Sequence, residues 1–142
     1  MKHTISTIAL ATLVAIASLT QAHAQTNAAR INVPFAFNSG TEHFAAGTYT
    51  VMTQGAYILA LRNDAQRGTR LSMVEFWSDA SSAHAPASLT FRKYGNTYFL
   101  AEYSTNGETL TLVKASKERS LSHEYAISDM PSTLVQVAAL ER

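Results

Sequence analysis

The feature that most constrains the fold is the stretch 88–113, which holds three short apolar runs separated by Gly95-Asn96 and by Asn106-Gly107. Short runs rich in aromatic, β-branched and leucine residues, joined by such dipeptides, are the strongest local signal for antiparallel hairpins. The stretch therefore predicts a three-stranded meander. It carries no obvious catalytic residues, so it is expected to act as scaffold.

The register of the first hairpin depends on keeping Glu102 away from the apolar face. A two-residue turn would pair Phe91 with Leu100 and would place Glu102 on that face. A three-residue loop with Asn96 left-handed and a bulge at the turn instead pairs Phe91 with Phe99, which keeps the apolar side chains together. Because a shift of one residue exchanges the two faces of a strand, we predict this second register.

The rest of the chain adds strand patterns and one helical pattern. The strand at 69–77 is apolar on both faces, and such a strand is usually central or covered. Residues 115–126 predict a short amphipathic helix with Ser116 as N-cap, which covers one end or face of the sheet. In the second hairpin of the meander, Tyr103 is expected opposite Leu110. The other predicted strands are 30–37, 47–53, 57–62 and 133–140.

These elements together predict the fold class. Short strands at regular spacing with tight connections are typical of antiparallel barrels and sandwiches. We therefore expect an all-β fold of about eight mostly antiparallel strands, in a small barrel or sandwich, with one short helix near the C-terminus at about 115–126.

The first 24 residues have the pattern of a secretory signal peptide. Lys2 precedes an uncharged apolar core at 8–19, and Ala22-His23-Ala24 matches the small-x-small cleavage pattern. That core is shorter than the roughly 20 residues that a spanning helix needs. We predict cleavage after Ala24, a mobile tail at 25–29 and a single β domain at 30–142. Such a chain is exported to the periplasm or the extracellular space and keeps no membrane anchor after cleavage.

Composition excludes several classes of function. The chain has 11 Lys and Arg against 10 Asp and Glu, whereas a nucleic-acid-binding domain shows a basic excess on one face. It has no cysteine, which excludes thiol catalysis, cysteine-ligated zinc and iron–sulfur clusters. The predicted domain must therefore be stabilised by packing alone, and we expect it to use no cofactor.

Metal-binding and catalytic patterns are weak. The histidines of the mature chain lie in three separate segments, without the local pair that usually seeds a metal site, so no metal is predicted. Neither Gly-x-Ser-x-Gly nor His-Glu-x-x-His occurs. Glu75 and Asp79, with His84, could serve a small hydrolase if they converge, but Glu75 and Asp79 are better explained as solvated charges at the rim of a loop. The three histidines are His43, His84 and His123.

Four segments resemble a group of small secreted bacterial proteins, common in soil acidobacteria, that have no assigned function. The resemblance covers nearly all of the mature chain and implies no catalytic residue. Members of the group usually have Leu-Pro where this chain has Phe44-Ala45, so the turn into the second predicted strand differs. The four segments are VPFAF at 33–37, AGTYTV at 46–51, FRKYGNTYFL at 91–100 and SKER at 116–119.

The leading functional prediction is a non-enzymatic exported binding domain. Flat aromatic rings at a sheet surface can stack on sugars or hold apolar ligands, and Trp77 ends a strand beside the long loop 78–87. We expect a small apolar or carbohydrate ligand at the Trp77–Ala87 loop end. One alternative is an envelope protein that pairs with a partner through an edge strand near Pro34; the other is the hydrolase. The candidate ligand-binding residues are Trp77, Tyr94, Tyr98, Glu75, Asp79 and His84.

Overall fold

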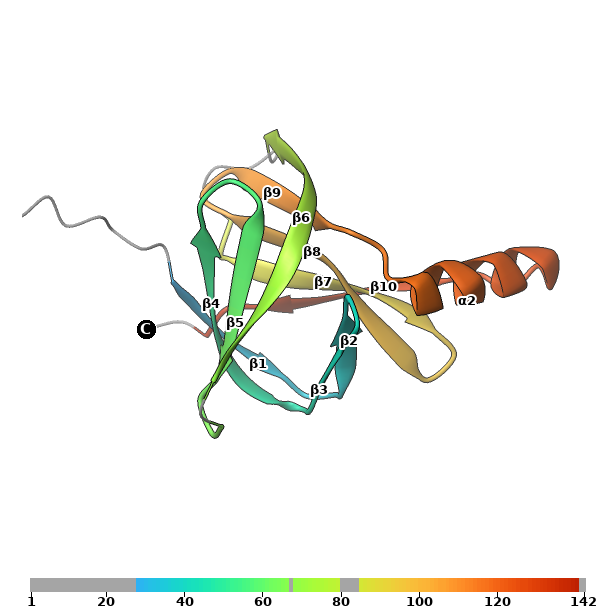
Figure 1. Ribbon diagram of the computed structural model, residues 1–142, viewed down its shortest axis with the longest axis horizontal. Helices are drawn as coiled ribbons and strands as arrows, with labels where there is room; N and C mark the ends of the chain where they lie inside the picture. Colours follow the sequence, from blue (N-terminus) through green and yellow to red (C-terminus); the bar gives the residue numbers. More distant parts are fainter. Residues whose placement is uncertain (1–27, 67, 80–84, 141–142) are drawn as a thin grey trace, which may run out of the picture.

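The computed structural model describes residues 28–66, 68–79 and 85–140, without the side chains of Phe76, Trp77 and Asp79. The predicted signal peptide lies outside these ranges. Among the described residues, no helix is long and apolar enough to cross a membrane. The elements, labelled as in Figure 1, are β1 (Ala29–Val33), β2 (Phe37–Ser39), β3 (Glu42–Phe44), β4 (Gly47–Gln54), β5 (Ile58–Asn63), β6 (Thr69–Asp79), β7 (Ser88–Tyr94), β8 (Thr97–Thr105), β9 (Glu108–Leu112), α2 (Ser116–Ile127) and β10 (Thr133–Ala138).

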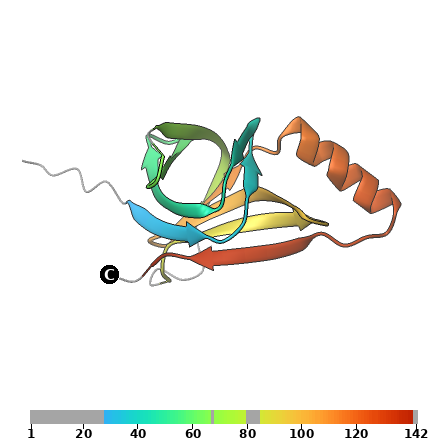
Figure 2. The same ribbon diagram turned by 90° about the horizontal axis from the view of Figure 1, so that it is seen from below.

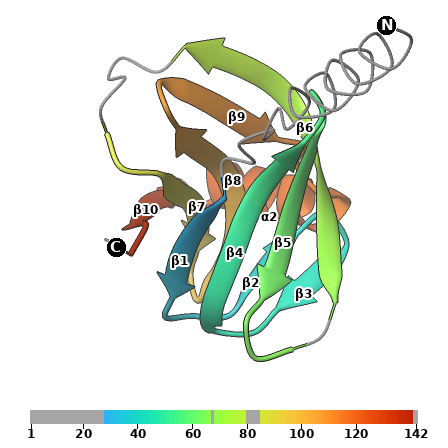
Figure 3. The ribbon, with the colours of Figure 1, turned by 90° about the vertical axis from the view of Figure 1, so that its left-hand side faces the viewer.

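The described strands form one mixed sheet of ten strands in the order β1-β4-β5-β6-β9-β8-β2-β3, with β7 paired to β8 and β10 paired to β7. All pairs are antiparallel except a parallel contact between Asn38 of β2 and Phe99 of β8. β1, β4 and β5 lie side by side (Figure 3), and the sheet curls around the core without closing into a barrel (Figure 2). The predicted all-β class with one short helix near the C-terminus is confirmed.

β6 belongs to both halves of this sheet. Residues 69–73 pair with β5, and residues 74–79 pair with β9, with a register shift between Val74 and Phe76. An irregularity of this kind bends a strand and increases its twist. The curl of the sheet therefore depends on β6, which passes from one half to the other.

The core lies inside this curl and is made by the inward side chains of alternating residues. Its aromatic centre is Phe37, which stacks on Phe44 at 4.8 Å and meets Phe91 edge to face at 5.1 Å between ring centroids. Burial of such side chains contributes roughly 1.5–3 kcal/mol each relative to exposure. The fully buried members are Ile31, Val33, Phe37, Val51, Leu59, Leu61, Leu89, Phe91, Tyr103 and Leu110.

The first predicted strand is split into two shorter ones. β1 ends at Val33 because Pro34 has no N–H to donate to a ladder. The chain then forms a hairpin of β2 and β3, whose turn includes Gly40 at φ 58°. Such a conformation is accessible to glycine at little cost. This hairpin, which the prediction of about eight strands had left out, accounts for the larger number of strands.

The first turn of the meander differs from the prediction. Tyr94 pairs with Thr97, so the turn has two residues, and Phe91 pairs with Leu100 rather than with Phe99. The left-handed residue is Gly95, at φ 59°, and not Asn96. Glycine at the first central position fits the tight hairpin turns whose twist matches that of the strands. The predicted three-residue loop is therefore wrong.

Glu102 is nevertheless kept away from the core, by a bulge placed elsewhere. The register shifts between Thr90 and Phe91, so Glu102 faces Thr90 and Leu89 faces Tyr103. The extra residue lies inside β8 rather than at the turn. Tyr103 pairs with Leu110 across the second hairpin, as predicted.

Helix α2 starts one residue later than predicted and extends from one end of the sheet (Figures 1 and 2). Its N-cap is Ala115, which makes no side-chain capping bond, so the prediction of Ser116 as N-cap is wrong. The helix is held by Glu118, which is 2% exposed and forms an ion pair with Arg92 of β7. Tyr125 adds an edge-to-face contact with Tyr94, with ring centroids 5.5 Å apart.

Candidate functional site

The residues predicted at the Trp77–Ala87 loop are only partly placed. Trp77 and Asp79 are in β6, but their side chains lie outside the described part of the chain, and so does all of His84. Glu75 is exposed on the same strand. The convergence of Glu75, Asp79 and His84 therefore stays a prediction.

The two tyrosines predicted at the site are packing residues. Tyr94 is 5% exposed and meets Phe99 and Tyr125 edge to face, so its ring is packed within the protein and is not open at the sheet surface. Its burial raises the pKa of the Tyr94 hydroxyl. Tyr98 is half-buried and stacks on Phe35, with 4.0 Å between the ring centroids.

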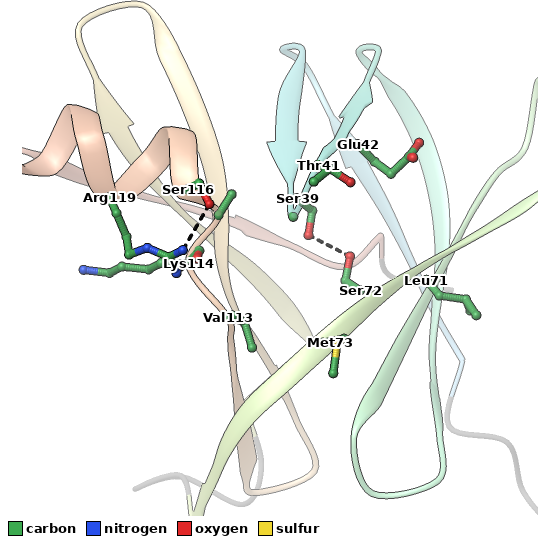
Figure 4. Close-up of a pocket in the computed structure, with 12 residues that line it drawn as sticks. Ser39, Thr41, Glu42, Leu71, Ser72, Met73, Val113, Lys114, Ser116 and Arg119 are labelled. Atoms are coloured by element: carbon green, nitrogen blue, oxygen red, sulfur yellow. Dashed lines mark hydrogen bonds between the residues drawn. The ribbon is translucent and has the colours of Figure 1, made fainter.

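A groove of about 350 Å³ opens where β6 separates from β9. The last contact before the opening is the hydrogen bond from Val113 N to Met73 O, at 3.2 Å. The groove is lined by the β2–β3 turn at 39–42, by 71–73 of β6 and by the segment 113–116 with Arg119 (Figure 4). We call it the β6 groove.

Apolar side chains lie exposed along the β6 groove. Leu71, Met73 and Val113 are 55%, 70% and 40% exposed. β6 is central in the sheet, in agreement with the prediction of a central or covered strand, but Leu71 and Met73 on one of its faces are exposed. Grouped exposed apolar side chains with polar groups around them are typical of binding surfaces.

Two buried serines join the strands at the groove. Ser39 of β2 and Ser72 of β6 are 4% and 5% exposed, and their hydroxyl oxygens lie 2.7 Å apart (Figure 4). A hydroxyl has one hydrogen and two lone pairs, so this bond uses only one of the two hydrogens. Within the described residues the side chains form no further hydrogen bond, which leaves one donor available to a ligand.

Positive charge collects at the start of α2. Arg119 Nη1 donates to Lys114 O at 2.7 Å, and Arg119 Nη2 donates to Ser116 Oγ at 3.1 Å. Lys117 lines a neighbouring hollow of about 540 Å³ that shares Ser116 with the β6 groove. No carboxylate of the described chain pairs with Lys114, Lys117 or Arg119. This end of the groove is therefore attractive to anions.

The opposite rim of the groove is electrically balanced. Arg70 forms an ion pair with Glu42 of β3 and lies over the Phe44 ring, 5.8 Å from its centroid. Both charged side chains are about half exposed, so the pair contributes at most about 1 kcal/mol to stability. Its role at the groove is to neutralise Glu42, which leaves the net charge of the lining positive.

Sequence reasoning missed this groove because its walls come from three distant segments. Ser39, Ser72 and Arg119 have no motif spacing that links them. One signal was present: an apolar strand with both faces hydrophobic, at 69–77, marks either a covered strand or an exposed binding surface.

Comparison of the chain with protein-family models, with curated proteins and with solved structures finds no match. The resemblance to small secreted acidobacterial proteins stays a prediction.

Proposed function

We propose that the protein is an exported, non-enzymatic binding domain that holds a small amphiphilic molecule with an anionic head in the β6 groove. The observation that carries the proposal is the placement of three exposed apolar side chains beside three cations that pair with no carboxylate of the described chain. The groove volume of about 350 Å³ is at the lower end of the range typical of small-molecule sites.

The two ends of the groove suit the two parts of such a ligand. An alkyl chain covering Leu71, Met73 and Val113 gains roughly 0.8 kcal/mol for each CH₂ that it removes from water. An anionic head accepts charge-assisted hydrogen bonds from Lys114 and from Arg119, which uses two of its donors in bonds to other described residues. A neutral oxygen near the head accepts the spare hydrogen of the serine pair.

The non-enzymatic part of the proposal rests on the surroundings of the two serines. A serine nucleophile needs a general base within hydrogen-bond reach. Within the described residues, Ser39 and Ser72 hydrogen-bond through their hydroxyls only to each other. They are therefore assigned to binding.

Export rests on the signal-peptide pattern of residues 1–24. The mass of the protein recovered from periplasm or medium is expected to correspond to a chain that starts at Gln25. Recovery of the full-length chain from the cytosol would contradict export, without bearing on the groove.

Calorimetric titration with octyl sulfate and octyl glucoside, both below their micelle concentrations, tests the binding proposal. The two probes share the alkyl chain and differ in head charge. We expect octyl sulfate to bind about tenfold more tightly, since a charge-assisted hydrogen bond contributes roughly 1.5–3 kcal/mol. Met73→Ser is expected to weaken the binding of both probes, because it removes apolar surface without adding charge. Arg119→Ala is expected to weaken the binding of octyl sulfate alone.

The control variant is Ile127→Ser, which changes an equally exposed apolar residue outside the groove. It is expected to leave both titrations unchanged. If neither probe binds, the proposed binding function is wrong. If both bind equally, the groove is apolar and does not select an anionic head group. Tighter binding of octyl glucoside would favour the carbohydrate ligand.

A further inference from the structure

β10 is an edge strand with an open side. One of its sides pairs with β7 along its whole length. On the other side, its contact with β1 is confined to the end of the strand, where Ile31 bridges Ala139 and Leu140 N donates to Arg30 O at 2.8 Å. The start of β10 extends away from β1 towards α2 (Figure 1).

The direction of the backbone groups follows from two hydrogen bonds at the end of this strand. Ala139 N donates to Ala87 O at 2.7 Å, next to β7, whereas Leu140 N points to β1. In an antiparallel ladder, alternate residues direct both N–H and C=O to the same side. The backbone groups of Leu134 and Gln136 therefore point to the open side, where the described part of the chain offers no ladder partner.

This edge lacks the usual protection against pairing. Natural edges are blunted by charged residues, proline or bulges, but the strand Thr133–Ala138 has the sequence TLVQVA and a regular register with β7. Leu134, the second residue of the strand, is 67% exposed. An uncharged, β-branched edge of this kind pairs with another strand readily.

The edge predicted from the sequence is a poorer candidate. β1 ends at Val33, directly before Pro34, and has only five residues. One side of β1 is paired with β4, and the other carries the contact between Arg30 and Leu140. The free backbone groups are on β10 instead.

We propose that β10 pairs antiparallel with β10 of a second copy of this chain, about a two-fold axis at Val135. The backbone N–H and C=O of each Leu134 then bond to the C=O and N–H of Gln136 in the second copy. All the free backbone groups of these two residues are therefore paired. With the axis at Val135, the end of β10 near Ala138 stays in contact with β1. Both copies use the same surface, as in an isologous interface. A formal net charge of +1 gives the copies little mutual repulsion.

Sedimentation velocity over a range of concentrations tests this pairing, which does not depend on the groove. The wild type is expected to dimerise. Leu134→Pro removes an N–H that faces the open side, a position where an edge strand tolerates proline. It should weaken dimerisation roughly 10- to 100-fold, because two hydrogen bonds are lost per dimer. Leu134→Thr keeps the N–H and should still dimerise, and circular dichroism verifies that each variant is folded.

The register is tested by cross-linking, since the chain has no cysteine of its own. Residues opposite each other at a two-fold axis between antiparallel strands come within disulfide reach. Val135→Cys should form a dimer-linked disulfide under mild oxidation, and Val137→Cys should not. A wild type that stays monomeric, an unaffected Leu134→Pro dimer, or cross-linking at 137 rather than 135 would overturn the proposal.

Discussion

At the scale of single residues, the buried tyrosines make the free energy of unfolding depend on pH in the alkaline range. Tyr103 is fully buried, and burial raises the pKa of its hydroxyl above the usual value of about 10. A raised pKa means that the folded state holds the proton more tightly than the unfolded state. The contribution of protonated Tyr103 to the free energy of unfolding is therefore complete below about pH 10. It is lost as the pH rises through the higher pKa of the folded state.

Tyr103→Phe removes this ionisation from both states. We expect its free energy of unfolding, measured by urea titration, to fall less steeply than that of the wild type between about pH 9 and pH 11. Tyr57→Phe is the matched control, because the Tyr57 ring is 67% exposed. Parallel pH profiles for wild type and Tyr103→Phe would show that the Tyr103 hydroxyl does not contribute to alkaline unfolding.

At the scale of elements, α2 depends on one buried ion pair. Arg92 and Glu118 have side chains that are 15% and 2% exposed, and Arg92 Nη2 is buried without a hydrogen-bond partner in the described chain. Removal of one partner leaves an uncompensated buried charge. Glu118→Ala is therefore expected to lower the free energy of unfolding by about 3–5 kcal/mol.

The double variant Arg92→Met with Glu118→Leu separates charge from packing. Replacement of both charges by apolar groups is expected to leave stability within about 1 kcal/mol of the wild type, measured by urea unfolding. A double variant as unstable as Glu118→Ala would contradict the assignment of the loss to an unpaired charge. Because Glu118 fixes the first turn of α2 beside Arg119, Glu118→Ala should also weaken the binding of octyl sulfate.

The meander shows what sequence can and cannot predict about elements. Its strands follow from apolar runs and turn dipeptides, and the need to keep Glu102 off the core was correctly identified. The place of the bulge was not, because a bulge at the turn and one inside β8 satisfy the same pattern. The packing of Phe91 against Phe35 and Phe37 depends on parts of the chain remote from this hairpin.

Short elements and surface sites are harder to predict for a related reason. Each strand of the β2–β3 hairpin has three residues, too few to show a period. Similarly, the N-cap of α2 is Ala115 although Ser116 has the better capping side chain, because the hydroxyl of Ser116 instead accepts a bond from Arg119. In the first case the pattern is too short to read, and in the second a side-chain contact within the first turn of α2 competes with capping.

At the scale of the whole molecule, function is proposed where the curl of the sheet is incomplete. β6 pairs with β9 only from Val74 onward, the β2–β3 turn approaches from the other side, and the segment 113–116 with Arg119 forms the remaining wall (Figure 4). Most of the strands could be predicted individually from the sequence, but neither the β2–β3 hairpin nor the gap beside it could. The position of the groove depends on the order of the strands in the sheet. That order is set by pairing between segments that are distant in the sequence.

The β6 groove, and not the loop after Trp77, is proposed to bind the ligand. Two-dimensional amide NMR spectra recorded during titration with octyl sulfate distinguish these two places. The largest shift changes are predicted at Gly40, Met73 and Arg119, on three separate segments that only the fold brings together. Changes centred instead on 75–79 and 85–87, or no changes at saturating probe, would contradict the account.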